Sequence, residues 1–189
     1  MKAWMLLMSL LIGLVGCAPG VTPVPPPSLA ETPFSSAELG FSMRYPQGWV
    51  VEEGETPGVI TFLDSRVKPG ADSMPAMPVS VAVLSGPRAG LGLPQGNITS
   101  PGVLNPLLQL LGVGMKIEAA APVAGTLAGK PAARVEVSGV LNVGTELVGR
   151  VAAVDLGNRV WAAFALAPKS EWQAFEPYFE QMMGSVVFR

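Results

Sequence analysis

The chain has 189 residues, with 12 Lys and Arg, 14 Asp and Glu, one Cys and no His. The slightly acidic balance and the scattered basic residues argue against nucleic acid as a partner, because phosphate binding depends on clustered Lys and Arg. The absence of His excludes Ser-His-Asp and Cys-His catalysis and His-ligated zinc. Without His, catalysis would need paired carboxylates or a Ser-Lys pair, and the spacing of these residues indicates neither. We therefore expect a protein that is not an enzyme and holds no cofactor.

The first 17 residues have the pattern of a bacterial lipoprotein signal. Lys2 is followed by an apolar segment, residues 3–15, and then by the small Gly16 and by Cys17. This apolar segment is too short for a transmembrane helix, which needs about 20 residues. We therefore predict that residues 1–16 are a signal peptide and that Cys17 is lipidated, which anchors the protein to the cell membrane or an outer membrane outside the cytoplasm. The alternative is a chance Cys after an ordinary signal peptide.

Residues 17–33 are predicted to be a tether that follows the lipidated Cys. Pro occupies positions 19, 23, 25, 26, 27 and 33. Such a segment favours extended polyproline II at about 3.1 Å per residue. Residues 34–189 then form one domain, which is long enough to bury a core without a metal ion or a disulfide.

Apolar and polar alternation predicts a mainly antiparallel sheet. Strands are expected at 41–45, 49–53, 59–64, 77–84, 133–141, 146–155, 159–167 and 185–188. In the fifth of these, Val135 and Val137 lie on one face and Arg134, Glu136 and Ser138 on the other, which is typical of a half-solvated strand. The turn Leu156-Gly-Asn158 suits antiparallel neighbours.

Two helices are predicted beside the strands. Asn105 as N-cap and Pro106 at the first position indicate a short helix at 107–111. Ser170 and Gln173 have the spacing of a capping box for a second helix that ends at Gly184. Its apolar stripe, interpreted as core, consists of Trp172, Phe175, Phe179 and Met182. Pro177 predicts a kink or a late helix start.

Three short motifs together resemble the PsbP-like family. They are Tyr45-Pro-x-x-Trp49, Gly129-Lys-Pro-Ala132, and Ser185-Val-Val-Phe188 after an aromatic helix. The resemblance covers about residues 38–189. It implies an α+β fold, an α/β/α sandwich with a central antiparallel sheet, and mostly non-enzymatic roles in binding or assembly. No catalytic motif comes with it, and the Gly- and Pro-rich segment before the middle helix departs from the family pattern.

Two groups of residues are weighed as metal ligands. Met74 and Met77 offer thioethers to Cu(I), but without His or Cys the site is incomplete. The carboxylates Glu52, Glu53, Glu55 and Asp64 are candidates for Ca²⁺, but their spacing is not that of an EF-hand. A space-filling role for the Met residues and a solvated acidic edge are the better interpretations, so no metal is expected.

Residues 85–101 carry four Gly and three Pro, and two interpretations stay open for this segment, a functional loop or disorder. Gly90-x-Gly92 with Gly96 lacks the Lys-Ser/Thr of a phosphate loop, and Asn97-Ile-Thr99 is interpreted as an accidental sequon. The leucines that follow are expected to be buried beneath the segment rather than to form an exposed apolar patch. They are Leu104, Leu107, Leu108, Leu110 and Leu111.

These observations predict a lipid-anchored, non-catalytic module for binding or assembly whose partners are the membrane, through Cys17, and an unidentified protein. The alternative is a carrier of a small apolar ligand or lipid, with the leucine-rich helix and residues 85–101 as a lid.

Overall fold

The computed structural model describes residues 28–31, 33–54, 56–64, 79–111, 116–140 and 144–189. The signal peptide, Cys17 and the tether up to residue 27 lie outside the described residues. Glu55, Met74 and Met77 lie outside them as well.

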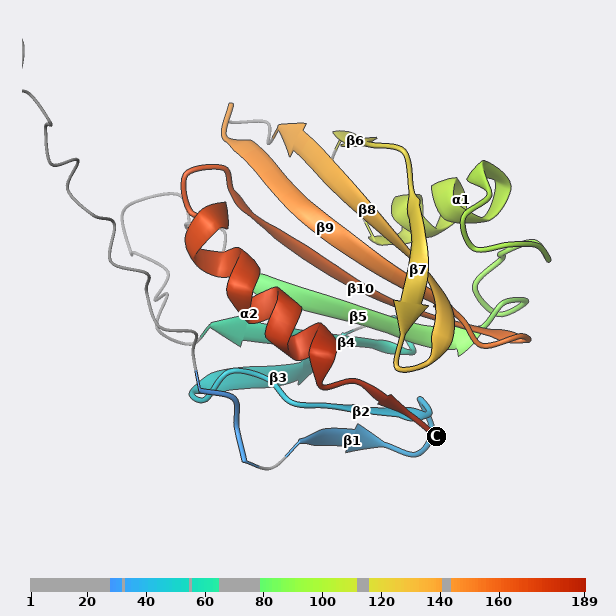
Figure 1. The fold of residues 1–189 in the computed structure, drawn as a ribbon, viewed down its shortest axis with the longest axis horizontal. Coiled ribbons are helices and arrows are strands. Elements are labelled where there is room, and N and C mark those ends of the chain that lie inside the picture. Colours follow the sequence, from blue (N-terminus) through green and yellow to red (C-terminus); the bar gives the residue numbers. More distant parts are fainter. Residues whose placement is uncertain (1–27, 32, 55, 65–78, 112–115, 141–143) are drawn as a thin grey trace, which may run out of the picture.

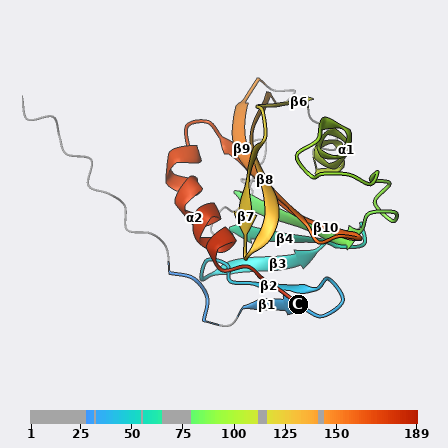
Figure 2. The same ribbon diagram turned by 45° about the vertical axis from the view of Figure 1, so that its right-hand side comes forward.

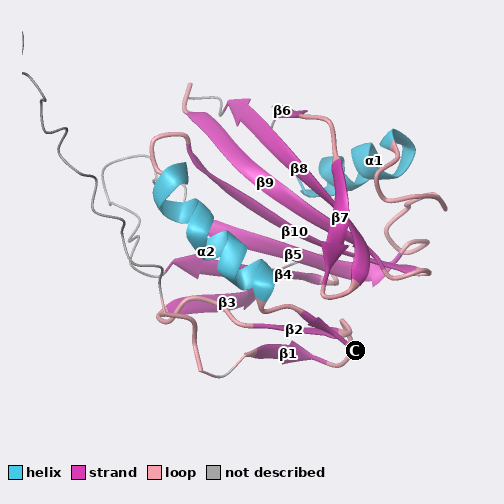
Figure 3. Cartoon of the chain, viewed as in Figure 1, coloured by secondary structure: helices cyan, strands magenta, loops and turns pink. Residues whose placement is uncertain are grey.

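Within the described residues, an eight-stranded antiparallel sheet forms the centre of the molecule (Figure 3). Its order is β3 (Trp49–Glu53), β4 (Val59–Asp64), β5 (Ser80–Pro87), β10 (Arg159–Pro168), β9 (Glu146–Asp155), β8 (Lys130–Val140) and β6 (Lys116–Ala119), and β7 (Val123–Leu127) also pairs with β8. A second sheet consists of β1 (Phe34–Ser36), β2 (Phe41–Met43) and β11 (Val187–Phe188). The helices are α1 (Pro101–Leu111) and α2 (Trp172–Gly184).

The two helices lie on opposite faces of the large sheet (Figures 1 and 2). The helix α2 and the small sheet share one apolar cluster with Ala163, Ala165 and Ala167 of β10. On the other side of β10, Ala162 and Leu166 pack in clusters with residues of α1. Because β10 is apolar on both faces, it can only occupy the middle of the molecule. This architecture confirms the predicted α/β/α sandwich with a central antiparallel sheet.

The long strands confirm the alternation patterns. The strands β3, β4 and β9 have the predicted bounds, and Val135 and Val137 of β8 are 1% and 4% exposed while its polar face is open. The strands β1, β6 and β7 were not predicted. They are three to five residues long, and four of the five residues in β7 are exposed, so a period-2 apolar signal does not develop in them.

The helix α1 begins at Pro101, five residues before Pro106, which was predicted to hold the first helical position. The Ser100 carbonyl accepts from the amides of Val103 and Leu104 at 3.0 and 2.9 Å, which places Pro101 at the first helical position. Pro106 therefore lies inside the helix. Because Pro106 has no amide hydrogen, the helix lacks the hydrogen bond to the carbonyl four residues earlier. The packing of α1 on the sheet compensates for that loss.

The predicted capping box of α2 is wrong. The N-cap is Glu171, which makes no side-chain capping hydrogen bond, so Ser170 and Gln173 stand one position too early for this motif. The Glu171 carbonyl instead accepts from the amides of Ala174 and Phe175, both at 3.1 Å. The helix begins before Pro177 and continues to Gly184; the expected late start is therefore wrong.

The apolar stripe of α2 is core, as predicted, over three of its four residues. Phe175, Phe179 and Met182 are at most 4% exposed, and Trp172 is half-buried. Phe175 stacks on Trp49 with ring centroids 6.1 Å apart. The stripe therefore connects α2 to the edge strand β3 as well as to β10.

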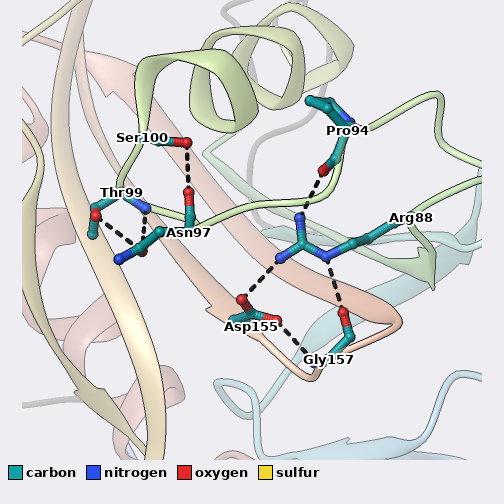
Figure 4. A network of polar contacts seen from close by, with 7 residues as sticks. All are labelled: Arg88, Pro94, Asn97, Thr99, Ser100, Asp155 and Gly157. Carbon is teal, nitrogen blue, oxygen red and sulfur yellow. Dashed lines mark hydrogen bonds and ion pairs between the residues drawn. The ribbon is translucent and has the colours of Figure 1, made fainter.

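Residues 85–101 contribute buried side chains to the domain, while most of the segment lies at the surface. Arg88 is 1% exposed; it pairs with the Asp155 carboxylate at 2.9 Å and donates to the carbonyls of Gly157 and Pro94, both at 3.0 Å (Figure 4). Ile98 is 1% exposed and packs with Val103 of α1. Of the two interpretations left open for this segment, disorder is therefore wrong.

Most leucines of α1 are buried, as predicted. Leu104, Leu107 and Leu108 are 3%, 0% and 8% exposed, whereas Leu110 is 43% exposed. The Asn97 side chain accepts from the amide and hydroxyl of Thr99 at 3.0 and 2.9 Å, a local turn that leads into the helix (Figure 4). The sequon residues thus have a structural role here.

Replacing Phe175 by Ala should lower the free energy of unfolding by about 3–5 kcal/mol, because truncating a buried Phe leaves a cavity. Urea titration measures this change. The control is Gln173→Ala on the exposed side of the same helix, which should stay within about 0.5 kcal/mol of the parent. Equal midpoints for the two variants would contradict the assignment of Phe175 to the core.

Candidate functional site

A groove of about 780 Å³ runs between the N-terminal half of α2 and the strands β8 and β9. Its floor is the polar face of β8 and the matching face of β9, and α2 forms one wall. A second hollow of about 590 Å³ continues it along β8 and β9 and shares Glu118, Ser138, Val148 and Lys169 with it. The residues that line the groove include Glu118, Glu136, Ser138, Val148, Arg150, Lys169, Trp172, Gln173 and Glu176.

Arg150 on β9 is the centre of the charge network in this groove. Its guanidinium contacts Glu180 at 2.6 Å, Glu176 at 2.7 Å and Glu136 at 3.4 Å, and its side chain is 18% exposed. Burial lowers the pKa of Arg150, but the hydrogen bond to Glu180 and the negative charges of Glu176 and Glu180 outweigh that effect, so its pKa is raised. The network therefore holds α2 against the sheet in a fixed position.

A second ion pair lies where the groove and the second hollow meet. Lys169, just before α2, contacts the Glu146 carboxylate at 2.8 Å, and its backbone amide donates to the Glu146 carbonyl at 3.0 Å. The hydrogen bond and the charge of Lys169 lower the pKa of Glu146, and Glu146 raises the pKa of Lys169 in return. Both side chains are exposed, so this pair orients the chain more than it stabilises it.

Gly149 lies between Val148 and Arg150, two residues of the groove. A Cβ at this position would overlap the carbonyl oxygen of Ala165 on β10. Only Gly allows β9 and β10 to approach this closely. The position of β9 in turn determines where the neighbouring Arg150 lies relative to α2.

The groove combines paired charges with apolar area. Its basic side chains, Arg150 and Lys169, are both held in ion pairs with carboxylates. In the part of the chain that the structure describes, there is no group of three or more His, Cys, Asp and Glu that could hold a metal ion. Half-buried Trp172 supplies apolar area beside these charges. Such a surface suits a polypeptide segment with polar and apolar side chains.

Of the carboxylates considered for Ca²⁺, the described Glu53 and Asp64 are not brought together. In the register of β3 and β4, Asp64 pairs with Trp49, whereas Glu53 pairs with Ile60. Four residues of extended strand separate the two pairs, which corresponds to about 13 Å. Glu52 and Glu53 are exposed, as expected for a solvated edge. Asp64 is only 8% exposed, so the solvated-edge interpretation is wrong for that residue.

The sequence did not identify the groove, although it contained partial signals for it. The alternation in β8 correctly placed Glu136 and Ser138 on an open face. Glu176 and Glu180 recur at helical spacing, which indicates one acidic face of α2. Their partner Arg150 lies 26 residues before Glu176 in the chain, and only the packing of α2 on β9 brings them together.

Sequence comparisons give no relatives: no family model matches the chain, and no curated protein matches it. Solved structures do resemble it. They include the cyanobacterial PsbP protein of Synechocystis, with 17% identity and a TM-score of 0.61 over 94% of this chain and 100% of that one. LpqN of Mycobacterium tuberculosis has 19% identity and a TM-score of 0.52 over 84% and 90% of the two chains. The yeast Ran-binding protein Mog1p has 11% identity and a TM-score of 0.54 over 85% and 96%.

At these identities the comparisons establish the fold alone. The domain has the PsbP-like fold, as the resemblance in the sequence implied. Among the described residues, no helix is both long and apolar enough to cross a membrane.

Replacing Arg150 by Met should lower the free energy of unfolding by about 1.5–3 kcal/mol, because hydrogen-bonded carboxylates of α2 lose their charged partner. The matched control is Arg134→Met. Arg134 also contacts Glu180, at 3.1 Å, but it is 46% exposed, so its loss should cost less than about 1 kcal/mol. Denaturant titration of both variants tests the difference. An equal loss in the two would contradict the central role of Arg150.

Proposed function

We propose that this protein is a lipid-anchored module outside the cytoplasm that binds a partner protein through the groove beside α2 and performs no chemistry of its own. The lipoprotein-type signal, the single Cys17 and the Pro-rich segment support the anchor. The PsbP-like domain would then be presented to its partner at the end of a tether.

The groove itself is the observation that carries the proposal. Its floor and wall are held in place by the contacts of Arg150 with Glu136 and Glu176. A partner therefore meets a preorganised surface and pays little ordering entropy on binding. Half-buried Trp172 in this surface is the residue type most enriched among the residues that dominate binding energy.

The descriptions of two proteins with this fold support a binding role in the cell envelope. LpqN is described as involved in cell envelope biogenesis, and Mog1p as a Ran-binding protein. The first supports a place in the cell envelope for this chain, and the second supports protein binding as a use of the fold. Function depends on the site and not on the fold, so the residues of this chain's own groove carry the rest of the proposal.

The alternative of an apolar-ligand carrier has less support. The space under residues 85–101 is occupied by core side chains, including Leu93, Ile98 and Leu107, which are at most 5% exposed. The hollows beside α2 carry Glu118, Lys169 and other charged groups, a lining that does not suit an apolar ligand.

The anchor is tested by Cys17→Ser, which removes the only thiol. We expect the variant to accumulate unprocessed or to be released, because acylation requires this Cys. Membrane fractionation with mass determination of the N-terminus is the measurement. A variant that has lost its signal peptide and still sediments with membranes would refute lipid anchoring.

The groove is tested by photo-crosslinking in intact cells, with the crosslinking amino acid placed at Gln173 in the groove or, as a matched control, at Leu110. Both positions are exposed on helices, but they lie on opposite faces of the sheet. We expect a discrete protein adduct from position 173 that is lost in an Arg150→Met background, since that change releases the groove wall.

Crosslinks from position 110 alone would place the binding surface on the α1 face. The absence of any adduct at either position would contradict a stable protein partner. Thermal unfolding of each labelled variant serves as the folding control.

A further inference from the structure

A pocket separate from both hollows beside α2, of about 620 Å³, lies at the end of the molecule where Figure 1 marks the C-terminus. Four separate segments build it: the turn after β1, the start of β8, the turn between β9 and β10, and β11 with the residue after it. Residues 28–31 enter the domain at the opposite end (Figure 1). The pocket is therefore separate from the entry of the chain. Of the groove residues beside α2, none lines it.

Three basic side chains line this pocket: Lys130, Arg159 and Arg189. The basic residues of the groove, Arg150 and Lys169, are paired with carboxylates. By contrast, none of these three forms an ion pair with a carboxylate of the described residues. Arg159 donates one hydrogen bond, to the Glu38 carbonyl at 3.0 Å.

The one acidic side chain in the pocket, Asp155, is already engaged. One of its oxygens contacts buried Arg88 at 2.9 Å, and the other accepts from the Gly157 amide at 2.8 Å (Figure 4). Its charge is compensated by Arg88 and does not neutralise the three basic residues. Even with a backbone carboxylate on Arg189, the net charge of the pocket would remain positive. In a chain with a formal net charge of −2, this is a local concentration of positive charge.

The backbone of the pocket is held by hydrogen bonds between the segments. The Arg189 amide donates to the Gly40 carbonyl at 2.9 Å, and the Ser85 hydroxyl donates to the Leu39 carbonyl at 2.7 Å. Gly40 and Gly157 have φ of +72° and +82°, a conformation that lets each turn close tightly. Leu39, Leu156 and Phe188 line the pocket and pack against the main apolar cluster. The pocket is therefore preformed, and part of its lining is apolar.

We propose that this pocket binds a small soluble molecule that carries a multivalent anionic group, either a phosphate or a pair of carboxylates. Two guanidinium groups and an ammonium group are the side chains that recognise such anions. The volume falls in the range of small-ligand sites, about 300–1,000 Å³. The apolar part of the lining, Leu39, Leu156 and Phe188, suits a ligand whose body extends beyond its charged group. The inference is independent of the function proposed for the groove.

The test is calorimetric titration of the full chain in detergent micelles with pyrophosphate and, separately, with citrate. We expect the double variant Lys130→Ala/Arg189→Ala to bind the preferred anion about tenfold more weakly than the parent, because two charged contacts are lost. The matched control is Arg44→Ala, which removes an exposed positive charge outside the pocket. Its affinity should stay within about twofold of the parent.

The two titrants distinguish the two chemistries. Binding of pyrophosphate alone assigns the site to phosphates, and binding of citrate alone assigns it to polycarboxylates. Amide shifts of Gly40 and Gly157 on titration locate the anion in the pocket. The proposal is overturned if neither anion binds, if the double variant binds as the parent does, or if Arg44→Ala weakens binding as much as the double variant. Lys130 and Arg189 are exposed, so unchanged thermal midpoints are expected and check that the variants fold.

Discussion

The structure depends on the burial of strand β10 on both faces. From Val160 to Ala167 every residue of β10 is buried, and its alternate side chains belong to apolar clusters on opposite sides of the sheet. The side toward α2 carries Ala163, Ala165 and Ala167, whose small side chains leave room for the bulky Phe and Met residues of the helix. Because both faces of this strand must be covered, a layer is required on each side of the large sheet. Here α1 covers one face, and α2 with the small sheet covers the other.

The position of α2 then determines the groove. The helix covers only part of its face of the sheet, so the outer parts of β8 and β9 remain open beside it. Arg150 occupies the boundary between the covered and open areas, where its contacts with Glu176 and Glu180 are partly shielded from water. Shielding makes these contacts stronger than those of exposed pairs such as Lys169 and Glu146. The same interactions that fasten the helix therefore give the groove its rigid wall.

The distribution of charge separates two surfaces of the domain. Beside α2 the basic side chains are paired with carboxylates, and the surface has a mixed character. At the turns that meet near Arg189, three basic side chains share one pocket, and its single acidic group is compensated by Arg88. Since the fold is shared with proteins of at most 19% identity, these surfaces, not the fold, must account for what this chain does.

The sequence by itself determined the features that depend on neighbours along the chain. Alternation gave the long strands, including the open polar face of β8 with Glu136, and helical spacing gave the buried side of α2, because these periods follow directly from backbone geometry. Short strands such as β7 and the start of α1 at Pro101 were missed, since few residues carry their local signal. Only the tertiary structure decided what depends on distance in space: the separation of Glu53 from Asp64 by strand register, the contact of Arg150 with Glu176, and the meeting of Lys130, Arg159 and Arg189. Those groups are far apart in the chain, and the packing of whole elements, not any local pattern, brings them together or holds them apart.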